Sequence, residues 1–216
     1  MREELPITNV SLVMDRDRWT PDMTGNGALR PVVLPCARVD TERLPDGALI
    51  RIEPLRRGDR ASVRGLFARL SAESRLRRFL SPMPALRERD LAFLSDVGNG
   101  THEAMAAVDP DDGSVAGIAR YVQHQGRPGV ADVAVAVADE MQRCGIGSAL
   151  MDRLIACALA NGFHLLTATT LWENRPARAL LRSMGFHATG SDGAEIELEL
   201  KLDVAPPLGP GGLLAC

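Results

Sequence analysis

Apolar positions between residues 59 and 95 recur with the period of a helix. In residues 63–70 the apolar side chains follow the spacing i, i+3, i+4 and i+7, and Asp59 stands where a helix N-cap is expected. Ser71 precedes a second apolar stripe of this kind, and a third, shorter stripe follows after two prolines. The pattern therefore predicts three consecutive helices.

Strand-like runs dominate the rest of the chain. Short links rich in Gly, Pro and Asp separate the second, third and fourth runs, which indicates an antiparallel meander. The later run HLLTATTL is predicted to be a buried strand, and AEIELELKL alternates as a final strand. The six predicted strands are residues 49–55, 102–109, 114–122, 130–137, 164–171 and 194–202.

Two further helices are predicted in the C-terminal half. One would begin at a glycine-containing loop and carry its apolar stripe on Ile146, Leu150, Leu154 and Ala158. The other would begin at Asn174, which can cap it, and end at Gly185. With the short third helix left out, the order β-α-α-β-β-β-α-β-α-β predicts an α/β (α+β) domain with a mixed sheet.

Amino-acid composition and hydrophobic periodicity divide the chain into three parts. We expect residues 1–48, which contain five prolines and no sustained period, to be a poorly ordered or partner-covering extension. Residues 49–203 form the predicted domain, and residues 204–216 a flexible tail. Hydrophobic residues make up 45% and charged residues 25%, which suits a globular protein. A net charge of -3 gives no field that would attract nucleic acid or a membrane.

The cysteines and histidines give no sign of a metal site. Four cysteines and four histidines are scattered without metal-ligand spacing, and cysteines so few and irregular argue against a disulfide framework. The N-terminus lacks the apolar core of a signal peptide, and no apolar run is long enough to span a bilayer. We therefore expect a cytoplasmic protein without a bound metal.

The strongest chemical signal is the junction between VADVAVAVADE and QRCGIGSALMDRLI. A strand leads into a Gly-x-Gly loop at the start of an amphipathic helix, where unpaired N–H groups and the helix dipole favour an anion. Gly145 and Gly147 would let the backbone approach a phosphate. A dinucleotide fingerprint is excluded because its third glycine is replaced by Leu150, and a P-loop is excluded because the loop has no lysine.

Two motifs in this order resemble the GNAT superfamily of N-acetyltransferases. The stretch Q-R-C-G-I-G is similar to the acyl-CoA motif Q/R-x-x-G-x-G/A, and ENRPARALLRSMGF (173–186) resembles the motif that follows it. LSAESRLRRFL (70–80) is similar to bacterial domains of the protein lysine acetyltransferase type. The resemblance covers residues 49–202 and implies the GNAT fold, with a mixed central sheet of about six to seven strands flanked by four to five helices.

The resemblance also implies a binding mode for acetyl-CoA. Backbone groups of Val135 and Val137 would pair with the pantetheine arm as with an added strand. Asn174 would contact the cofactor near its thioester end, although a plain helix N-cap explains this residue equally well. Where common members have Gly-Arg, this chain has Arg143-Cys144. The amides around the pyrophosphate would be those of Gln142, Arg143, Cys144, Gly145, Ile146, Gly147 and Ser148.

Asp132 is the candidate general base. An amine attacks a thioester only when deprotonated, so a base is useful at neutral pH. On an alternating strand, Asp132 shares a face with Ala134 and Ala136, which leaves room for a substrate or water. Related lysine acetyltransferase domains have glutamate here, so the reach is shorter by one methylene. An ordinary solvated or salt-bridged aspartate is the competing interpretation.

No general acid is evident for the departing thiolate. Many GNAT enzymes have tyrosine at the position of Leu181, and the single tyrosine, Tyr121, lies on an earlier strand where a structural role is expected. A thiolate is a good leaving group, so solvent can protonate it.

Three functions remain open on these grounds. The first is transfer of an acetyl group from acetyl-CoA to a primary amine, either a protein lysine or a small molecule. The second is a catalytically weak or inactive acyl-CoA-binding sensor, favoured by Asp132 and Leu181. The third is a structural or interaction protein. The expected partners are acetyl-CoA and an amine acceptor, with a homodimer left open.

Overall fold

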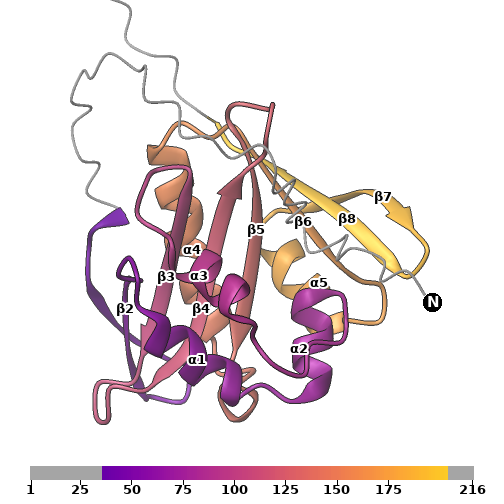
Figure 1. The fold of residues 1–216 in the computed structure, drawn as a ribbon. Coiled ribbons are helices and arrows are strands. Elements are labelled where there is room, and N and C mark those ends of the chain that lie inside the picture. Colours follow the sequence, from indigo (N-terminus) through magenta and orange to yellow (C-terminus); the bar gives the residue numbers. More distant parts are fainter. Residues whose placement is uncertain (1–35, 204–216) are drawn as a thin grey trace, which may run out of the picture.

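The computed structural model describes residues 36–203, which contain one eight-stranded sheet with the order β1-β2-β3-β4-β5-β6-β8-β7. All neighbouring strands are antiparallel except the central pair β5 and β6, which are parallel. Figure 1 shows this sheet running through the molecule. The strands are β1 (Asp40–Arg43), β2 (Leu49–Pro54), β3 (His102–Val108), β4 (Val115–Gln123), β5 (Val130–Val137), β6 (Leu165–Leu171), β7 (His187–Asp192) and β8 (Glu195–Lys201).

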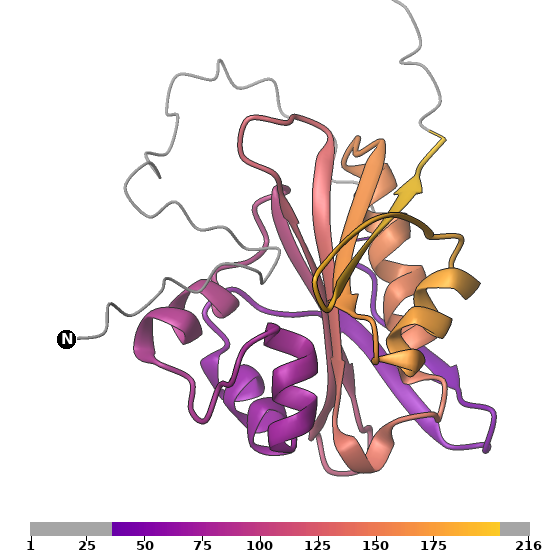
Figure 2. The ribbon, with the colours of Figure 1, turned by 90° about the vertical axis from the view of Figure 1, so that its right-hand side faces the viewer.

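Five α-helices cover the two faces of the sheet, and they lie on opposite sides in Figure 2. One face is covered by α1 (Arg60–Ala68), α2 (Ala72–Phe79) and α3 (Glu88–Ser95). The other carries α4 (Ile146–Ala160) and α5 (Arg175–Ser183). We call these the α1–α3 face and the α4 face.

Each face has its own hydrophobic core. The predicted stripe of α4 is buried completely: Ile146, Leu150, Leu154 and Ala158 are at most 1% exposed and pack on β3, β4 and β5. The second core lies under α1, α2 and α3. Because side chains alternate along a strand, β4 contributes Ala119 and Tyr121 to the first core and Ile118 to the second.

Side-chain caps fix where the helices begin. Asp59 accepts a hydrogen bond from the Ser62 amide at 3.0 Å, and Ser71 accepts one from the Ser74 amide at 3.1 Å. Asn174 accepts one from the Ala177 amide at 3.3 Å. The predicted caps at Asp59 and Asn174 are therefore confirmed. Each satisfies one of the amides that the first helical turn leaves unpaired.

The sheet has two strands more than the six that the sequence pattern predicted, and one or two more than the family resemblance implied. Strand β1 lies within residues 1–48, which we had assigned to the extension, and it pairs with β2 from Asp40 to Arg43. Strand β7 has the sequence HATGSD and is exposed along its whole length, so it carries no apolar alternation that would reveal it. Residues 1–35 of the predicted extension and the predicted tail, residues 204–216, lie outside the described residues.

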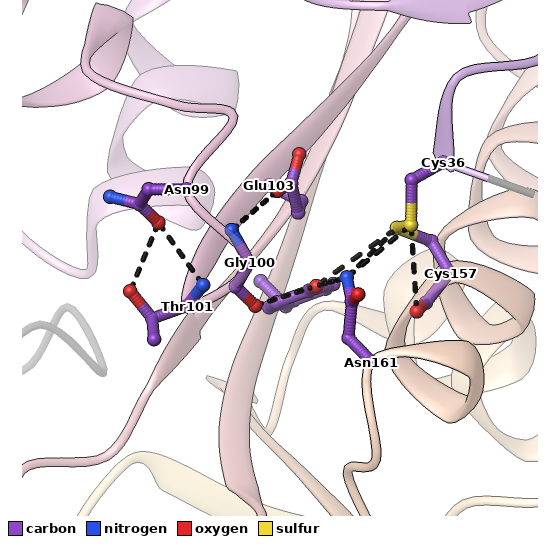
Figure 3. The surroundings of a disulfide bond; sticks show 8 residues. Cys36, Asn99, Gly100, Thr101, Glu103, Cys157 and Asn161 are labelled. Atoms are coloured by element: carbon purple, nitrogen blue, oxygen red, sulfur yellow. Dashed lines mark hydrogen bonds between the residues drawn. A yellow bond between two sulfur atoms is a disulfide. The ribbon is translucent and has the colours of Figure 1, made fainter. Parts of the chain in front are cut away.

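A disulfide joins Cys36 to Cys157 on α4, with 4.9 Å between the two Cα atoms (Figure 3). The expectation that the scattered cysteines form no disulfide is wrong for this pair, because a sequence separation of 121 residues says nothing about distance in the fold. Next to the disulfide, Asn161 Nδ2 donates to Tyr121 Oη at 2.6 Å, and Tyr121 Oη donates to the Gly100 carbonyl at 3.1 Å. Tyr121 is fully buried, as expected for a structural residue.

Among the helices of residues 36–203, none combines the length and the apolar character that crossing a membrane requires. The same residues contain no cluster of three or more His, Cys, Asp or Glu side chains that could hold a metal ion.

Candidate active site

Strands β5 and β6 pair over only three residues and then diverge (Figure 1). The paired residues of β5 are Val130, Ala131 and Asp132, opposite residues 165–167 of β6. On its other side, β5 pairs with β4 along its length, from Ala131 to Val137. Residues 133–137 of β5 are therefore hydrogen-bonded to β4 on one edge and face the opening between the strands with the other.

The backbone groups at this open edge belong to the odd-numbered residues. The Ala138 amide donates to Ala116 on the β4 side at 2.8 Å. Since hydrogen-bonding directions alternate along an antiparallel strand, Val133, Val135 and Val137 point their backbone groups toward the opening. The Val137 carbonyl there accepts a hydrogen bond from the Gln142 side chain at 3.1 Å. Val135 thus offers its N–H and C=O to a ligand strand.

A 3-10 turn, Asp139–Met141, connects the open edge to the loop before α4. Arg143 has φ +65° and Gly145 has φ +94°, so the backbone turns twice through the left-handed region before the helix starts. A non-glycine residue in this region is strained by about 1–2 kcal/mol and points to a functional constraint. Turns of this kind gather amides around an anion, and the first turn of α4 adds its own free N–H groups.

Gly145 and Gly147 lie where side chains would interfere. A Cβ atom on Gly145 would come within 3.0 Å of Pro45 Cδ, and one on Gly147 within 3.2 Å of Leu180 Cδ2. The positive φ of Gly145 also disfavours any other residue. Both glycines are partly exposed, so an anion can reach the loop backbone from solvent, as a pyrophosphate site requires. The residues present fit coenzyme A.

The other residues assigned to the loop lie around the same helix start. Gln142 and Arg143 are exposed, and Cys144 is partly exposed with its Sγ 3.6 Å from the Gln142 carbonyl. Besides the Val137 carbonyl, the Gln142 amide group contacts Asp139 Oδ1 at 3.2 Å, which fixes the loop to the end of β5. Ile146, Gly147 and Ser148 form the first turn of α4.

Asn174 and Leu181 both belong to α5. Asn174 is 8% exposed; besides capping the helix, it donates from Nδ2 to Thr170 Oγ1 at 3.2 Å. Its contact with a cofactor stays a prediction. Leu181 is 6% exposed and packs in the core of the α4 face, so no acid occupies that position.

Asp132 lies where β5 and β6 begin to diverge. Its carboxylate accepts a hydrogen bond from Thr167 Oγ1 on β6 and pairs with His124 Nε2 at 2.9 Å. Burial raises the pKa of Asp132, while Thr167 and His124 act in the opposite direction. The side chain is 13% exposed. A carboxyl group with this surrounding can exchange a proton nearer to neutral pH than an exposed aspartate.

His124 and Thr167 are the site residues that the sequence analysis missed. His124 follows β4, and the hairpin to β5 brings it back toward Asp132, because Gln123 pairs with Ala131. Thr167 is the register partner of Asp132 on β6. Alternation predicted that Asp132 shares a face with Ala134 and Ala136, and Ala136 does pack in the core of the α1–α3 face.

Comparisons with known proteins match this chain to one family. The sequence model of the acetyltransferase (GNAT) family matches residues 70–186. An acetyltransferase of Pseudomonas aeruginosa is 34% identical over 147 residues, which cover 67% of this chain and 78% of that protein.

Solved structures agree on the fold. The GNAT domain of the S. lividans PAT has a TM-score of 0.69 at 24% identity, covering 76% of this chain and 97% of that one. The Salmonella typhimurium protein yncA, solved with its cofactor acetyl-CoA, has a TM-score of 0.58 at 20% identity, covering 71% and 94%.

Proposed function

Since the chain belongs to the GNAT family of acetyltransferases, we propose that it transfers the acetyl group of acetyl-CoA to a primary amine by direct attack of the amine on the thioester. The observation that carries this proposal is the open edge of β5, which is followed, after a single 3-10 turn, by the glycine loop at the start of α4. An extended ligand arm that ends in a pyrophosphate suits both parts at once.

The donor would be held almost entirely by main-chain groups. The amides of residues 142–148 surround the pyrophosphate, and Val135 and Val137 pair with the pantetheine arm. When bound, acetyl-CoA supplies the electrophilic thioester carbonyl. The Val135 N–H faces the opening and can donate to that carbonyl oxygen, a form of stabilisation that costs no rearrangement during the reaction.

Asp132 would take the proton of the acceptor amine, directly or through one water molecule. A free lysine has a pKa of about 10.4, so its attack at neutral pH depends on such a base. Thr167 and His124 hold the carboxylate in place, and His124 provides an imidazole through which the proton can leave. The aspartate therefore has the polar support that a base needs, despite its shorter reach.

Protonation of the leaving thiolate is left to solvent. Leu181 is apolar and buried, and Tyr121 is buried beside the disulfide with its hydroxyl already hydrogen-bonded. A thiol with a pKa of about 8.5 leaves readily without a dedicated acid.

The proposal is tested by calorimetric titration with CoA and acetyl-CoA, followed by detection of free CoA thiol with a panel of primary amines. We expect saturable binding of both ligands and thiol release that depends on the amine. Saturable binding without transfer to any amine would indicate the sensor instead. Absence of binding would remove the proposal altogether.

A further inference from the structure

A cavity of about 30 Å³ lies between the helices of the α1–α3 face and strands β4 and β5. This volume has room for about two water molecules or one carboxylate group. Most of its lining is apolar, with Leu66 and Phe67 from α1, Phe79 from α2 and Ile118 from β4. Two arginines, Arg78 and Arg120, complete the wall. An apolar cavity with two convergent cations is built to bind an anionic group.

Arg120 is 4% exposed, and its hydrogen-bond partners within residues 36–203 are neutral groups. Its Nη1 donates to the Leu94 carbonyl at 2.8 Å and lies 3.3 Å from His102 Nε2. Burial and the charge of Arg120 lower the pKa of His102 to about 3, so the imidazole is neutral. These contacts fix the guanidinium in position without neutralising its charge.

Arg78 brings a second positive charge to the same cavity. Its guanidinium lies over the Phe79 ring at 4.9 Å, and the residue is partly exposed. Burial lowers the pKa of Arg78 to about 10, and burial together with the charge of Arg78 lowers the pKa of Arg120 to about 9. In the described part of the chain, no carboxylate forms an ion pair with either arginine. Arg120 is buried and Arg78 is partly buried. Two like charges in such a place without a counterion are unfavourable, and a bound anion would relieve that cost.

The cavity lies on the same face of the sheet as the candidate base, and Ala136 of β5 belongs to its lining. Arg120 is the register partner of Ala134, which is two residues from Asp132 along β5 and on the same face. That separation corresponds to about 7 Å. The glycine loop continues into α4 on the other face of the sheet, so the arginines do not serve the pyrophosphate. An anion in the cavity would belong to the acceptor.

We propose that Arg78 and Arg120 form a subsite for a carboxylate of the acceptor, so that the substrate is a small amino-carboxylic acid rather than a lysine side chain of a protein. This inference rests on the proposed acetyl transfer and adds the substrate class. A guanidinium suits a carboxylate because its planar N–H groups match the two oxygens.

The test compares matched acceptors in the presence of acetyl-CoA. The panel contains the standard L-amino acids, their carboxamides and a lysine peptide with blocked ends. We expect the KM of the best amino acid to be about 10- to 100-fold lower than that of its carboxamide, the range for a charge-assisted hydrogen bond. Equal KM values for acid and amide, or acetylation of the peptide alone, would overturn the subsite.

Two variants on α2 test whether Arg78 causes the difference in KM between the amino acid and its carboxamide. Arg78→Met should raise the KM of the amino acid about 10- to 100-fold toward that of the amide, leaving the amide KM and CoA affinity unchanged. Arg77→Met is the matched control, since Arg77 pairs with Glu73 at 2.5 Å on the same helix. Equal effects of the two variants on KM would refute the assignment. Loss of CoA binding by the wild type would instead contradict the proposed function.

A binding measurement without turnover completes the design. Thermal shift is measured with the amino acids, the carboxamides, inorganic phosphate and sulfate, for the wild type and for Arg78→Met. We expect stabilisation by amino acids that the variant loses. Stronger stabilisation by phosphate or sulfate would overturn the choice of a carboxylate, and no stabilisation by any amino acid would overturn the subsite.

Discussion

The two faces of strand β5 present different chemical groups: main-chain amides adjoin one face, and charged side chains lie on the other. On the α4 face, β5 carries valines, and the adjoining loop presents main-chain amides opened by Gly145 and Gly147. On the α1–α3 face, the same strand carries Asp132 and two alanines, next to Arg120 and the cavity. The proposed donor side thus relies on backbone geometry, and the proposed acceptor side relies on charged side chains.

This difference shows which features can vary independently. Backbone contacts to a pyrophosphate depend on the course of a single loop and tolerate many side chains around it. A carboxylate site depends on particular side chains from α2 and β4, so a few substitutions there would change the acceptor without disturbing the donor. We expect variants on one face to leave the other face functional, and the predictions below test that separation.

The largest effect is expected at Asp132. Asp132→Asn removes the base but keeps the shape of the side chain, so kcat should fall about 100-fold, the lower end of the range for a general base. CoA affinity should be unchanged. Because burial raises the pKa of Asp132, the acid limb of the wild-type pH–rate profile should lie above the value of about 3.9 for a free aspartate, and the variant should lose it.

Steady-state kinetics and calorimetry measure the two quantities separately. Asp152→Asn, on the exposed side of α4, is the control and should behave as wild type. Unchanged kcat in Asp132→Asn would show that the base assignment is wrong, while the donor assignment would stand.

A smaller effect is expected at Gly145. Gly145→Ala places a Cβ in the left-handed region and within 3.0 Å of Pro45 Cδ, so the loop must shift. The conformational cost of about 1–2 kcal/mol corresponds to roughly 5- to 30-fold weaker binding of CoA, measured by calorimetry.

The control for Gly145→Ala is a glycine that also has a positive φ but lies away from the site. Gly113 has φ +73° in the turn between β3 and β4, with no atom within 4 Å of a Cβ. Gly113→Ala should lower the melting temperature without weakening CoA binding. Equal losses of CoA affinity in both variants would mean that Gly145 matters only for stability.

The smallest effect concerns stability on the α1–α3 face. The folded protein keeps His102 neutral down to about pH 3, whereas the unfolded chain protonates it near pH 6.5. The unfolded state therefore binds more protons between these values, and stability falls as the pH decreases. In His102→Gln, the loss of unfolding free energy from pH 6.5 to pH 5 should shrink by about 2 kcal/mol.

Urea unfolding at the two pH values measures this change. His187→Gln replaces an exposed histidine on β7 and should retain the wild-type difference. If His102→Gln retained it as well, the neutral state of His102 beside Arg120 would be refuted.

The donor side could be predicted from the sequence because it is contiguous. Residues 130–160 contain a strand, a loop with two glycines and an apolar stripe, and the structure confirms this order. The caps at Asp59 and Asn174 were also predictable, since capping depends on residues within one turn.

The residues of the proposed acceptor side could not be predicted in this way, because they are far apart in the sequence. Arg120 is the one charged residue in the apolar run 115–122, which is a local signal of a special role, but its neighbour Arg78 lies on a helix 42 positions earlier. His124 meets Asp132 only through the register of a hairpin. Strand register and helix packing decide these contacts, and neither is visible in local periodicity.

The short pairing of β5 and β6 also has a consequence for handling the protein. A strand that leaves its backbone groups unpaired can recruit a strand from another molecule, which is how many β-aggregates begin. Here that edge lies in the middle of the sheet, where coenzyme A would occupy it. Preparations freed of the ligand should therefore precipitate sooner on storage than preparations to which CoA is returned.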